Sequence, residues 1–314
     1  MNIQQLEYIV AVDNHRHFAK AAEVCCIAQP TLSAMIQKLE DELGVKIFDR
    51  SKYPIEPTLI GRQVIEQART SLRNLKHIYE MVDNEKEVVK GIFKLGVIPT
   101  IAPFLIPELL NHWNETHQHY QHIKLILKES TTKTMIEEIA NGTLDGGVLA
   151  GPLNHAKLVE YPLYYEQFYA YVSKEEQYKE KEVDLNSIDI DNLWLLENVH
   201  CFRGQIERLC HLKKSASKNR NVFYEAGSID TLINIVDYNQ GMTIIPEMSA
   251  MGLSEEKQEN LRTFKDLTAV REVSLVVSKE YVRKTMLNII MNLITDSVPK
   301  SMLDTGLKKF VVEL

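Results

Sequence analysis

The strongest constraint on the fold of this chain is a stretch near its start that predicts two short helices joined by a tight turn. The first helix is expected from about Phe18 to Cys25. Gln29 and Pro30 open the second, because proline is favourable at the first helical position, and Gly44 is a suitable C-terminal stop. Apolar residues recur between them at helical spacing, at Leu32, Met35, Ile36, Leu39 and Leu43. Two such helices, the second polar on its outward face, are typical of a helix-turn-helix.

The residues that follow predict a wing and then a long helix. Two short strands around a basic turn are expected in the stretch VKIFDRSKYPIEPTLIG. From Leu59 to about Val89 the sequence has almost no turn residues, and apolar residues recur at helical intervals. A helix of that length leaving a small domain is expected to serve as a linker and dimerisation element.

From residue 90 onward, stretches typical of strands alternate with helical stretches, which predicts parallel α/β sheets. Two units of this kind would leave a cleft between them, a common place for a ligand. The expected domains are a winged helix-turn-helix at 1–58, a linker helix at 59–89 and a regulatory domain at 90–314. The regulatory domain is expected to divide into subdomain I, about 90–161 and 269–300, and subdomain II, about 162–268.

Charge by itself does not predict the function. The chain carries a net charge of -7, and residues 1–78 hold ten Lys/Arg against nine Asp/Glu, so DNA binding has to be argued from the motif. The start, MNIQQLEYIV, lacks the features of a signal peptide, and no apolar stretch approaches the length of a membrane span. A cytoplasmic protein without a membrane partner is therefore expected, in which the four cysteines are not a disulfide scaffold.

Two of the cysteines, Cys201 and Cys210, lie in the stretch VHCFRGQIERLCH, whose apolar spacing predicts a helix over 201–212. Nine helical residues rise about 13.5 Å, whereas a disulfide needs Cα atoms about 4.4–6.8 Å apart. The pair therefore cannot bond, or share one metal ion, while this helix is intact, and a bond would require it to unwind. Burial of both as small apolar residues stays an alternative, and a zinc site with His200 and His211 has the wrong spacing.

Motifs in the N-terminal region resemble those of the LysR-type transcriptional regulators. They are Ala21-Ala22, Gln29-Pro30-Thr31-Leu32-Ser33, Ile36, Leu39-Glu40, Leu43-Gly44 and Phe48-Asp49-Arg50. Within that family, the chain is most similar to peroxide-sensing members in the stretches LEYIVAVDNHRHFAKAAEVC, GVIPTIAPFLIP and HCFRGQIERLC. The nine-residue separation of the two cysteines distinguishes these members from the other regulators of the family. Two positions depart from the pattern: Gly204 replaces a residue that is usually polar or acidic, and Cys25-Cys26 doubles a single cysteine. Both cysteines of the doublet are expected in the core of the DNA-binding domain, with secondary oxidation as the alternative.

The resemblance implies a hydrogen-peroxide-sensing regulator of oxidative stress genes, with an α/β regulatory domain of the two-subdomain, periplasmic-binding-protein type. It is expected to be an activator rather than an enzyme, to use no cofactor and no metal, and to assemble from homodimer to homotetramer. Its other expected partners are hydrogen peroxide, RNA polymerase and a thiol reductant of the glutaredoxin or thioredoxin type. Peroxide would be bound by Thr100, Thr132 (or its neighbour Thr131), His200 and Arg271.

Cys201 is the expected attacking thiol, because His200, Arg203 and a helix N-terminus would lower the pKa of its thiol. Peroxide would convert this thiol to a sulfenic acid, which condenses with the second thiol, Cys210. Gly204, a weak helix former, would make unwinding easier by up to about 1 kcal/mol relative to alanine.

The second helix of a helix-turn-helix lies in the major groove of DNA. The residues expected to contact base edges and phosphates from this helix are Gln29, Thr31, Ser33, Gln37 and Lys38. Arg50 and Lys52 of the wing are expected on phosphates. A dimer would place two recognition helices about one DNA turn apart, ~34–36 Å, so double-stranded DNA with an inverted repeat is the expected partner.

Three other functions stay open on the sequence alone. A LysR-type regulator that binds a small organic effector in the cleft between its subdomains would leave the cysteines incidental. A peroxidase-like thiol enzyme is disfavoured by the helix-turn-helix, and a solute-binding protein of the same α/β type is disfavoured by the missing signal peptide.

Overall fold

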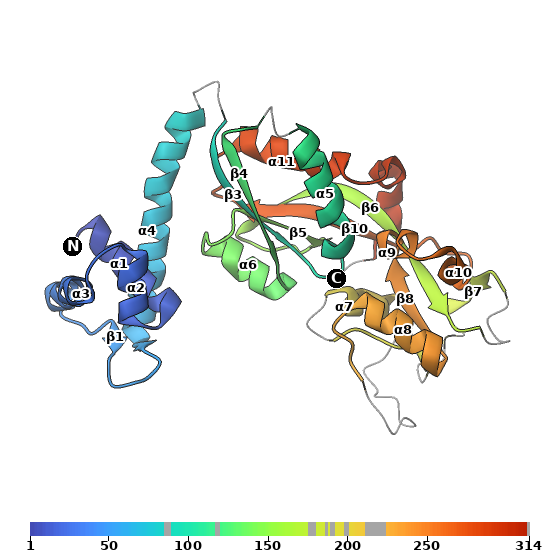
Figure 1. The fold of residues 1–314 in the computed structure, drawn as a ribbon, viewed down its shortest axis with the longest axis horizontal. Coiled ribbons are helices and arrows are strands. Elements are labelled where there is room, and N and C mark those ends of the chain that lie inside the picture. The colour runs from blue at the N-terminus through green and yellow to red at the C-terminus, as the bar shows by residue number, and fades with distance from the viewer. Residues whose placement is uncertain are drawn as a thin grey trace. The chain divides into compact units, whose positions relative to one another are not determined.

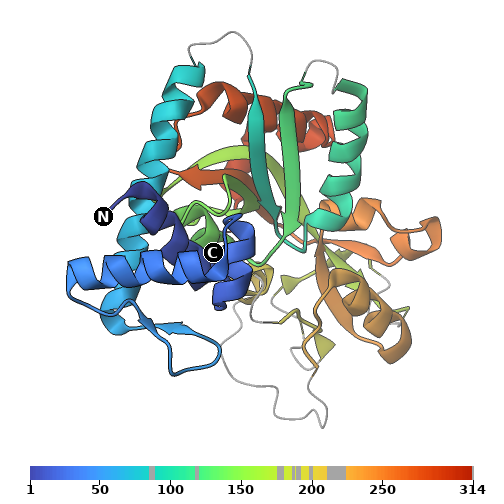
Figure 2. The same ribbon diagram turned by 60° about the vertical axis from the view of Figure 1, so that its left-hand side comes forward.

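The structure, a computed structural model, describes residues 1–84, 89–116, 120–174, 180–185, 188, 192–197, 201–210 and 224–312. The chain forms two compact units, Met1–Glu87 and Val88–Leu314, whose elements can be followed in Figures 1 and 2. Within the described ranges, no helix is both long enough and apolar enough to cross a membrane.

The N-terminal unit is a winged helix-turn-helix followed by a long helix, as the sequence predicts. Its elements are α1 (Ile3–His15), α2 (Phe18–Val24), α3 (Gln29–Leu43), β1 (Phe48–Asp49), β2 (Glu56–Pro57) and α4 (Leu59–Asn84). Gly44 ends α3 with a left-handed φ of 69°, a conformation that favours glycine. β1 and β2 pair antiparallel and form the wing. The described part of α4 ends at Asn84, and the predicted continuation over 85–88 lies outside the described residues.

The apolar faces of α1, α2 and α3 build the core of this unit. Leu32, Ile36 and Leu39 are fully buried, which confirms most of the apolar stripe predicted for the second helix. Leu43 is 39% exposed, because it lies in the last turn of α3, where the helix leaves the core. The apolar spacing therefore predicts the buried face of α3 correctly, but its buried apolar residues end at Leu39, one turn before Leu43.

The first half of the C-terminal unit is a sheet with helices packed on it. Its parallel strands are β3 (Gly91–Val97), β4 (Ile123–Glu129) and β5 (Gly146–Gly151), and the connecting helices are α5 (Ala102–Thr116) and α6 (Thr132–Ala140). Glycines let α6 approach this sheet closely. A Cβ added at Gly96 would lie 2.5 Å from the Met135 sulfur, and one added at Gly147 would lie 2.8 Å from it. Any other residue at these positions would therefore force the methionine or the helix to move.

One long strand, β6 (Leu158–Val172), runs through both halves of the unit. It pairs antiparallel with β10 (Val270–Ser278) along its first part, and with β8 (Met242–Pro246) and β9 (Leu261–Phe264) along its last part. β10 also pairs antiparallel with β5. The expectation of parallel sheets therefore holds for β3, β4 and β5 and is wrong for the pairs that β6 and β10 form. β6 carries the chain out of the first half and β10 returns it, so the two neighbours run in opposite directions.

Two hydrophobic cores lie along β6. Tyr164 belongs to the first core and Phe168 to the second. The remaining elements are β7 (Glu182–Val183), α7 (Cys201–Leu209), α8 (Ile229–Asn239), α9 (Glu247–Met251), α10 (Glu255–Gln258), α11 (Lys284–Asp296), η5 (Lys300–Leu303) and η6 (Thr305–Phe310). Outside the named strands, Ala226 forms an isolated bridge with Leu196.

Candidate redox and DNA-binding sites

Two of the residues predicted to bind peroxide lie at the same edge of the sheet. Thr100 comes three residues after β3 and Thr132 three residues after β4, and these strands are parallel neighbours. The carboxyl ends of parallel strands meet at one edge, where ligands of open α/β sheets bind. Thr131, the alternative to Thr132, is the N-cap of α6, and its hydroxyl accepts from the Thr134 N–H.

Arg271 of β10 is fully buried and connects Thr100 to the helix that carries both cysteines. Its Nε donates to Glu166 Oε1 at 2.6 Å, and its Nη1 donates to the Thr100 hydroxyl oxygen at 2.9 Å. Its guanidinium carbon lies 5.3 Å from the ring centroid of Phe202, a cation–π distance. Phe202 is the second residue of α7, so this arginine touches the first turn of the helix that begins at Cys201.

The two cysteines lie at opposite ends of an intact helix. α7 begins at Cys201, and the Cys210 N–H donates to the Ile206 carbonyl at 2.9 Å, which continues the helical hydrogen bonding to the second cysteine. A helical path between them rises about 13.5 Å, too far for a disulfide, and Cys210 is a free cysteine. His200 and His211, expected beside the two thiols, lie outside the described residues.

Burial raises the pKa of the Cys210 thiol to about 12. The side chain is half-buried and packs against the second core. Because the thiolate is the nucleophile, this shift lowers the reactivity of Cys210 at neutral pH. Such protection suits a second thiol that reacts only after a structural change.

Two residues close to Cys201 in sequence, Arg203 and Gly204, have surroundings that bear on their expected roles. Arg203, expected to lower the pKa of Cys201, forms ion pairs with Glu207, at 2.9 Å, and with Glu225. These carboxylates offset its charge. Gly204 has open space around it, since an added Cβ would meet no atom within 4 Å. No packing constraint therefore requires glycine at this position.

The C-terminal tail also holds α7, a contact that no periodicity or motif in the sequence indicates. Gln205 is fully buried, and its Nε2 donates to the Val312 carbonyl at 3.2 Å. The Val312 N–H donates in turn to the Val270 carbonyl at 2.8 Å. The tail therefore joins the middle of α7 to β10, one residue before Arg271.

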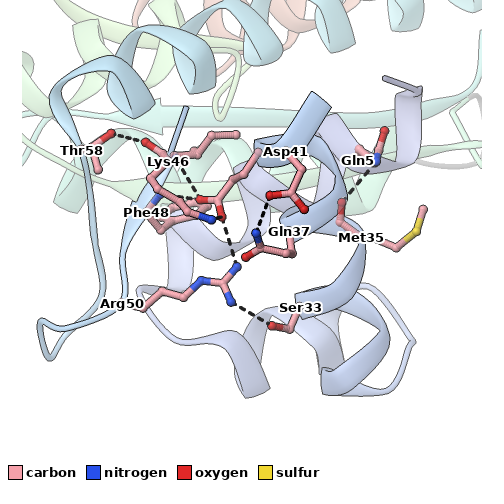
Figure 3. A network of polar contacts seen from close by, with 11 residues as sticks. Gln5, Ser33, Met35, Gln37, Asp41, Lys46, Phe48, Arg50 and Thr58 are labelled. Carbon is pink, nitrogen blue, oxygen red and sulfur yellow. Dashed lines mark hydrogen bonds and ion pairs between the residues drawn. The ribbon is translucent and has the colours of Figure 1, made fainter. Parts of the chain in front are cut away.

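The recognition helix α3 presents the predicted DNA-contacting residues on its outer side. Gln29, Thr31 and Lys38 are exposed, and Ser33 and Gln37 are half-buried. Arg50 extends from the wing to this helix, where its Nη1 donates to Ser33 Oγ at 3.4 Å (Figure 3). The arginine also lies over the Phe18 ring, 5.2 Å from its centroid. Wing and recognition helix therefore share one polar surface.

Glu40 is the buried group that holds the wing on α3, a role that its place in the Leu39-Glu40 motif does not by itself reveal. It is 1% exposed, and its Oε1 accepts from the N–H groups of Ile47 and Phe48 at 2.7 and 3.2 Å. Its Oε2 pairs with Lys46 and Arg50 (Figure 3). A buried carboxylate is stable only with partners of this kind. The position of Glu40 directly after the buried Leu39, on the apolar side of the helix, is the signal that could have revealed it.

Two other predicted DNA contacts already have partners within the domain. Lys52 Nζ lies 2.8 Å from Glu56 Oε2, and Gln37 Nε2 donates to Asp41 Oδ1 at 2.7 Å. Exposed pairs of this type contribute about 0–1 kcal/mol, so either group can exchange its partner for a phosphate at little cost.

The Cys25-Cys26 doublet lies in the turn of the helix-turn-helix. Cys26 is exposed, with a left-handed φ of 55°, so the expectation that it belongs to the core is wrong. The turn between α2 and α3 forces this side chain outward. Cys25 is half-buried and packs against the core, where burial raises the pKa of its thiol.

A pocket of about 770 Å³ lies elsewhere in the C-terminal unit, beside α5, α9 and the end of α11. Its lining combines apolar and acidic side chains, among them Phe104, Met248, Met251, Glu108 and Asp296. The described peroxide candidates Thr100, Thr132 and Arg271 are not among the residues that line it. A small organic effector, the alternative signal, would be sought here.

Two family models match the chain and cover both units. Residues 3–62 match the bacterial regulatory helix-turn-helix protein, lysR family, and residues 86–298 match the LysR substrate binding domain. With the winged helix-turn-helix and the two-core α/β unit, these matches define the class of protein. The chain belongs to the LysR family of transcriptional regulators, which are DNA-binding proteins.

Within that family the chain is similar to proteins named for hydrogen peroxide. It is 34% identical to the hydrogen peroxide-inducible genes activator of Pectobacterium carotovorum subsp. carotovorum, over 79% of this chain and 81% of the relative. It is also 34% identical to the DNA-binding transcriptional dual regulator OxyR of Escherichia coli K12, over 79% of this chain and 80% of the relative. A full-length OxyR variant from Pseudomonas aeruginosa superimposes with a TM-score of 0.76 at 27% identity, over 94% of this chain and 98% of that one.

Proposed function

We propose that this protein is a hydrogen-peroxide-sensing transcriptional regulator, switched by oxidation of Cys201 and formation of a Cys201–Cys210 disulfide. The relatives named for peroxide-inducible genes support the choice of signal. The observation that carries the site is the buried run from Thr100 through Arg271 to Phe202. It joins a predicted peroxide-binding residue to the first turn of α7.

In the proposed reaction the Cys201 thiolate attacks one oxygen of hydrogen peroxide. An S–O bond forms while the O–O bond breaks, so the sulfur is oxidised to a sulfenic acid and the peroxide is reduced. The second oxygen leaves as hydroxide and takes up a proton to become water. Hydrogen-bond donors near that oxygen assist its departure. The proposed donors are Thr100, Thr132, His200 and Arg271.

In the second step the Cys210 thiol condenses with the sulfenic acid. An S–S bond forms and water leaves. α7 has to unwind first, because the intact helix keeps the two cysteines too far apart. Unwinding would also free Cys210 from the core that raises its pKa to about 12. A thiol reductant of the glutaredoxin or thioredoxin type would return both sulfurs to thiols.

The rearrangement of α7 is the proposed signal to the DNA-binding unit. A homodimer through α4, and a homotetramer built from it, would place pairs of recognition helices on an inverted repeat. Gln29, Thr31, Ser33, Gln37 and Lys38 would contact bases and phosphates, and Arg50 and Lys52 phosphates. RNA polymerase is the proposed partner in activation.

The test is to treat the purified, reduced protein with one equivalent of hydrogen peroxide and to map its disulfides by peptide mass spectrometry. A rapid Cys201–Cys210 bond is expected, absent from Cys201→Ser. Cys26→Ser is the matched control, since Cys26 is exposed and lies in the other unit, and it should behave like the wild type. Slow, scattered oxidation that leaves the pair as thiols would contradict the proposal. A small effector, screened for binding in the pocket beside α5, would then be the better explanation.

A further inference from the structure

Glu166, like Arg271, is fully buried, and its carboxylate binds two nitrogen atoms of the Arg271 guanidinium. The two residues lie opposite each other in the register of β6 and β10, so their side chains leave the same face of the sheet. Glu166 Oε1 lies 2.6 Å from Arg271 Nε and 2.5 Å from Nη2. The other carboxylate oxygen accepts from the Met248 N–H at 3.2 Å. A planar guanidinium bound along one edge in this way has a single orientation.

That orientation determines what the Thr100 hydroxyl can do. Arg271 Nη1 donates to Thr100 Oγ1 at 2.9 Å, and Nη2 donates to the Thr100 carbonyl at 3.3 Å. Because the hydroxyl oxygen accepts from the arginine, its single proton is left to donate elsewhere. Among the residues that the structure describes, none accepts that proton. A hydroxyl that accepts a charge-assisted hydrogen bond is also polarised into a stronger donor.

We propose that Glu166 is a positioning residue for peroxide reduction. By holding Arg271, it aims the Thr100 O–H at the peroxide oxygen that leaves when Cys201 is oxidised. Glu166 does not touch peroxide, and its effect passes through Arg271 and Thr100. The same guanidinium lies over Phe202, so one anchor orients both the donor and the first turn of α7. This inference rests on the proposed function above.

The test is a double-mutant cycle on the rate constant for the reaction of Cys201 with hydrogen peroxide. Thr100→Val removes the donor and should slow this reaction by about 100-fold, a loss typical of one transition-state hydrogen bond. Glu166→Gln keeps the shape of the side chain and weakens its hold on Arg271, and should slow it by about tenfold. The double variant should react less than about twofold more slowly than Thr100→Val alone, because the effect of Glu166→Gln passes through the Thr100 hydroxyl.

Two controls separate positioning from a loss of structure. Glu272→Gln changes a buried carboxylate one residue from Arg271 on the same strand. Its partners are Ser274 and Tyr165, so this change should leave the rate unchanged. Alkylation of Cys201 by iodoacetamide needs the thiolate but no proton donor for a leaving oxygen, and should stay within about twofold of wild type in every variant. If Glu166→Gln does not fold, Glu166→Asp replaces it in the cycle, since the shorter side chain keeps the charge but cannot bind Arg271 Nε and Nη2 from the same position.

The outcomes are distinct. A wild-type rate no faster than that of free cysteine would reject the proposed function, and this inference with it. A fast wild type with an unaffected Glu166→Gln variant would overturn the inference alone. So would fully additive losses in the double variant, an equal loss in Glu272→Gln, or faster alkylation of Cys201 in Glu166→Gln.

Discussion

Arg271 and Phe202 are in contact, with the guanidinium carbon 5.3 Å from the centroid of the ring, although one residue lies in β10 and the other in α7. Both side chains are fully buried. The attraction of a desolvated cation to an aromatic face is about 2 kcal/mol. This contact makes the first turn of α7 part of the same buried group as Thr100. A rearrangement of α7 therefore has to break a specific interaction with the arginine.

Gly204→Ala should slow the formation of the disulfide. The added Cβ meets no atom within 4 Å, so the substitution stabilises intact α7 through helix propensity alone, by about 1 kcal/mol. That difference corresponds to roughly a fivefold lower population of unwound helix. Quenched-flow mass spectrometry should show slower disulfide formation with an unchanged rate of sulfenic acid trapping. Equal disulfide rates in the two proteins would mean that unwinding of α7 does not limit the second step.

Cys210 should resist alkylation across the alkaline range as long as the protein is folded. With its pKa raised to about 12 by burial, the thiolate fraction at pH 9 is roughly a thousandfold below that of an ordinary thiol. Iodoacetamide labelling, followed by peptide mass spectrometry, should therefore be slow in the native protein and normal in guanidinium chloride. The same shift makes the folded state bind a proton that the unfolded state has lost. Stability from this group is thus present below about pH 9 and declines as pH rises from there towards 12. Rapid labelling of the native protein at pH 8 would refute the protected state.

Deleting the residues after Phe310 should weaken the hold on α7. The Gln205 amide would lose the Val312 carbonyl and remain buried without that partner, which costs about 1–3 kcal/mol. The melting temperature of the reduced protein should fall, and the disulfide should form faster. Deletion after Val312 is the matched control, because it keeps the acceptor and should change neither quantity. If both deletions behaved alike, the hydrogen bond between Gln205 and Val312 would not stabilise α7.

Glu40→Ala should destabilise the DNA-binding unit by about 2–3 kcal/mol, because the N–H groups of Ile47 and Phe48 would lose their buried acceptor. Thermal unfolding of the full chain and its affinity for DNA would report the loss. Glu42→Ala is the control on the same helix, since Glu42 is exposed and pairs with the N-terminal ammonium. That change should stay within about 0.5 kcal/mol. A similar loss of stability in both variants would show that the buried Glu40 carboxylate does not stabilise the contact between α3 and the wing.

Much of the DNA-binding unit could be predicted, because its signals are local. Pro30 in the first turn favours the start of α3, and Gly44 ends the helix, through backbone properties that act within one turn. The buried positions Leu32, Ile36 and Leu39 follow from helical spacing alone. Cys26 was predicted in the core as a small apolar residue, but α2 ends at Val24 and the turn directs the Cys26 side chain outward.

The strand directions of the regulatory unit could not be predicted in the same way. Alternating strands and helices indicate an α/β unit, but not that β6 would cross from one core to the other. The antiparallel pairing of β6 with β10 depends on the path of the whole chain. It is this pairing that brings Glu166 opposite Arg271.

The sequence by itself determined the class of the protein, the helix that separates Cys201 from Cys210, and the residues available for chemistry. These follow from spacing, turn residues and family motifs, which are properties of short stretches. Only the tertiary structure decided which distant charges neutralise one another: Arg203 with Glu225, Arg271 with Glu166, and Glu40 with the wing. The reason is physical. A buried charge takes whichever opposite charge or dipole the fold brings within about 4 Å, and that partner can lie anywhere along the chain.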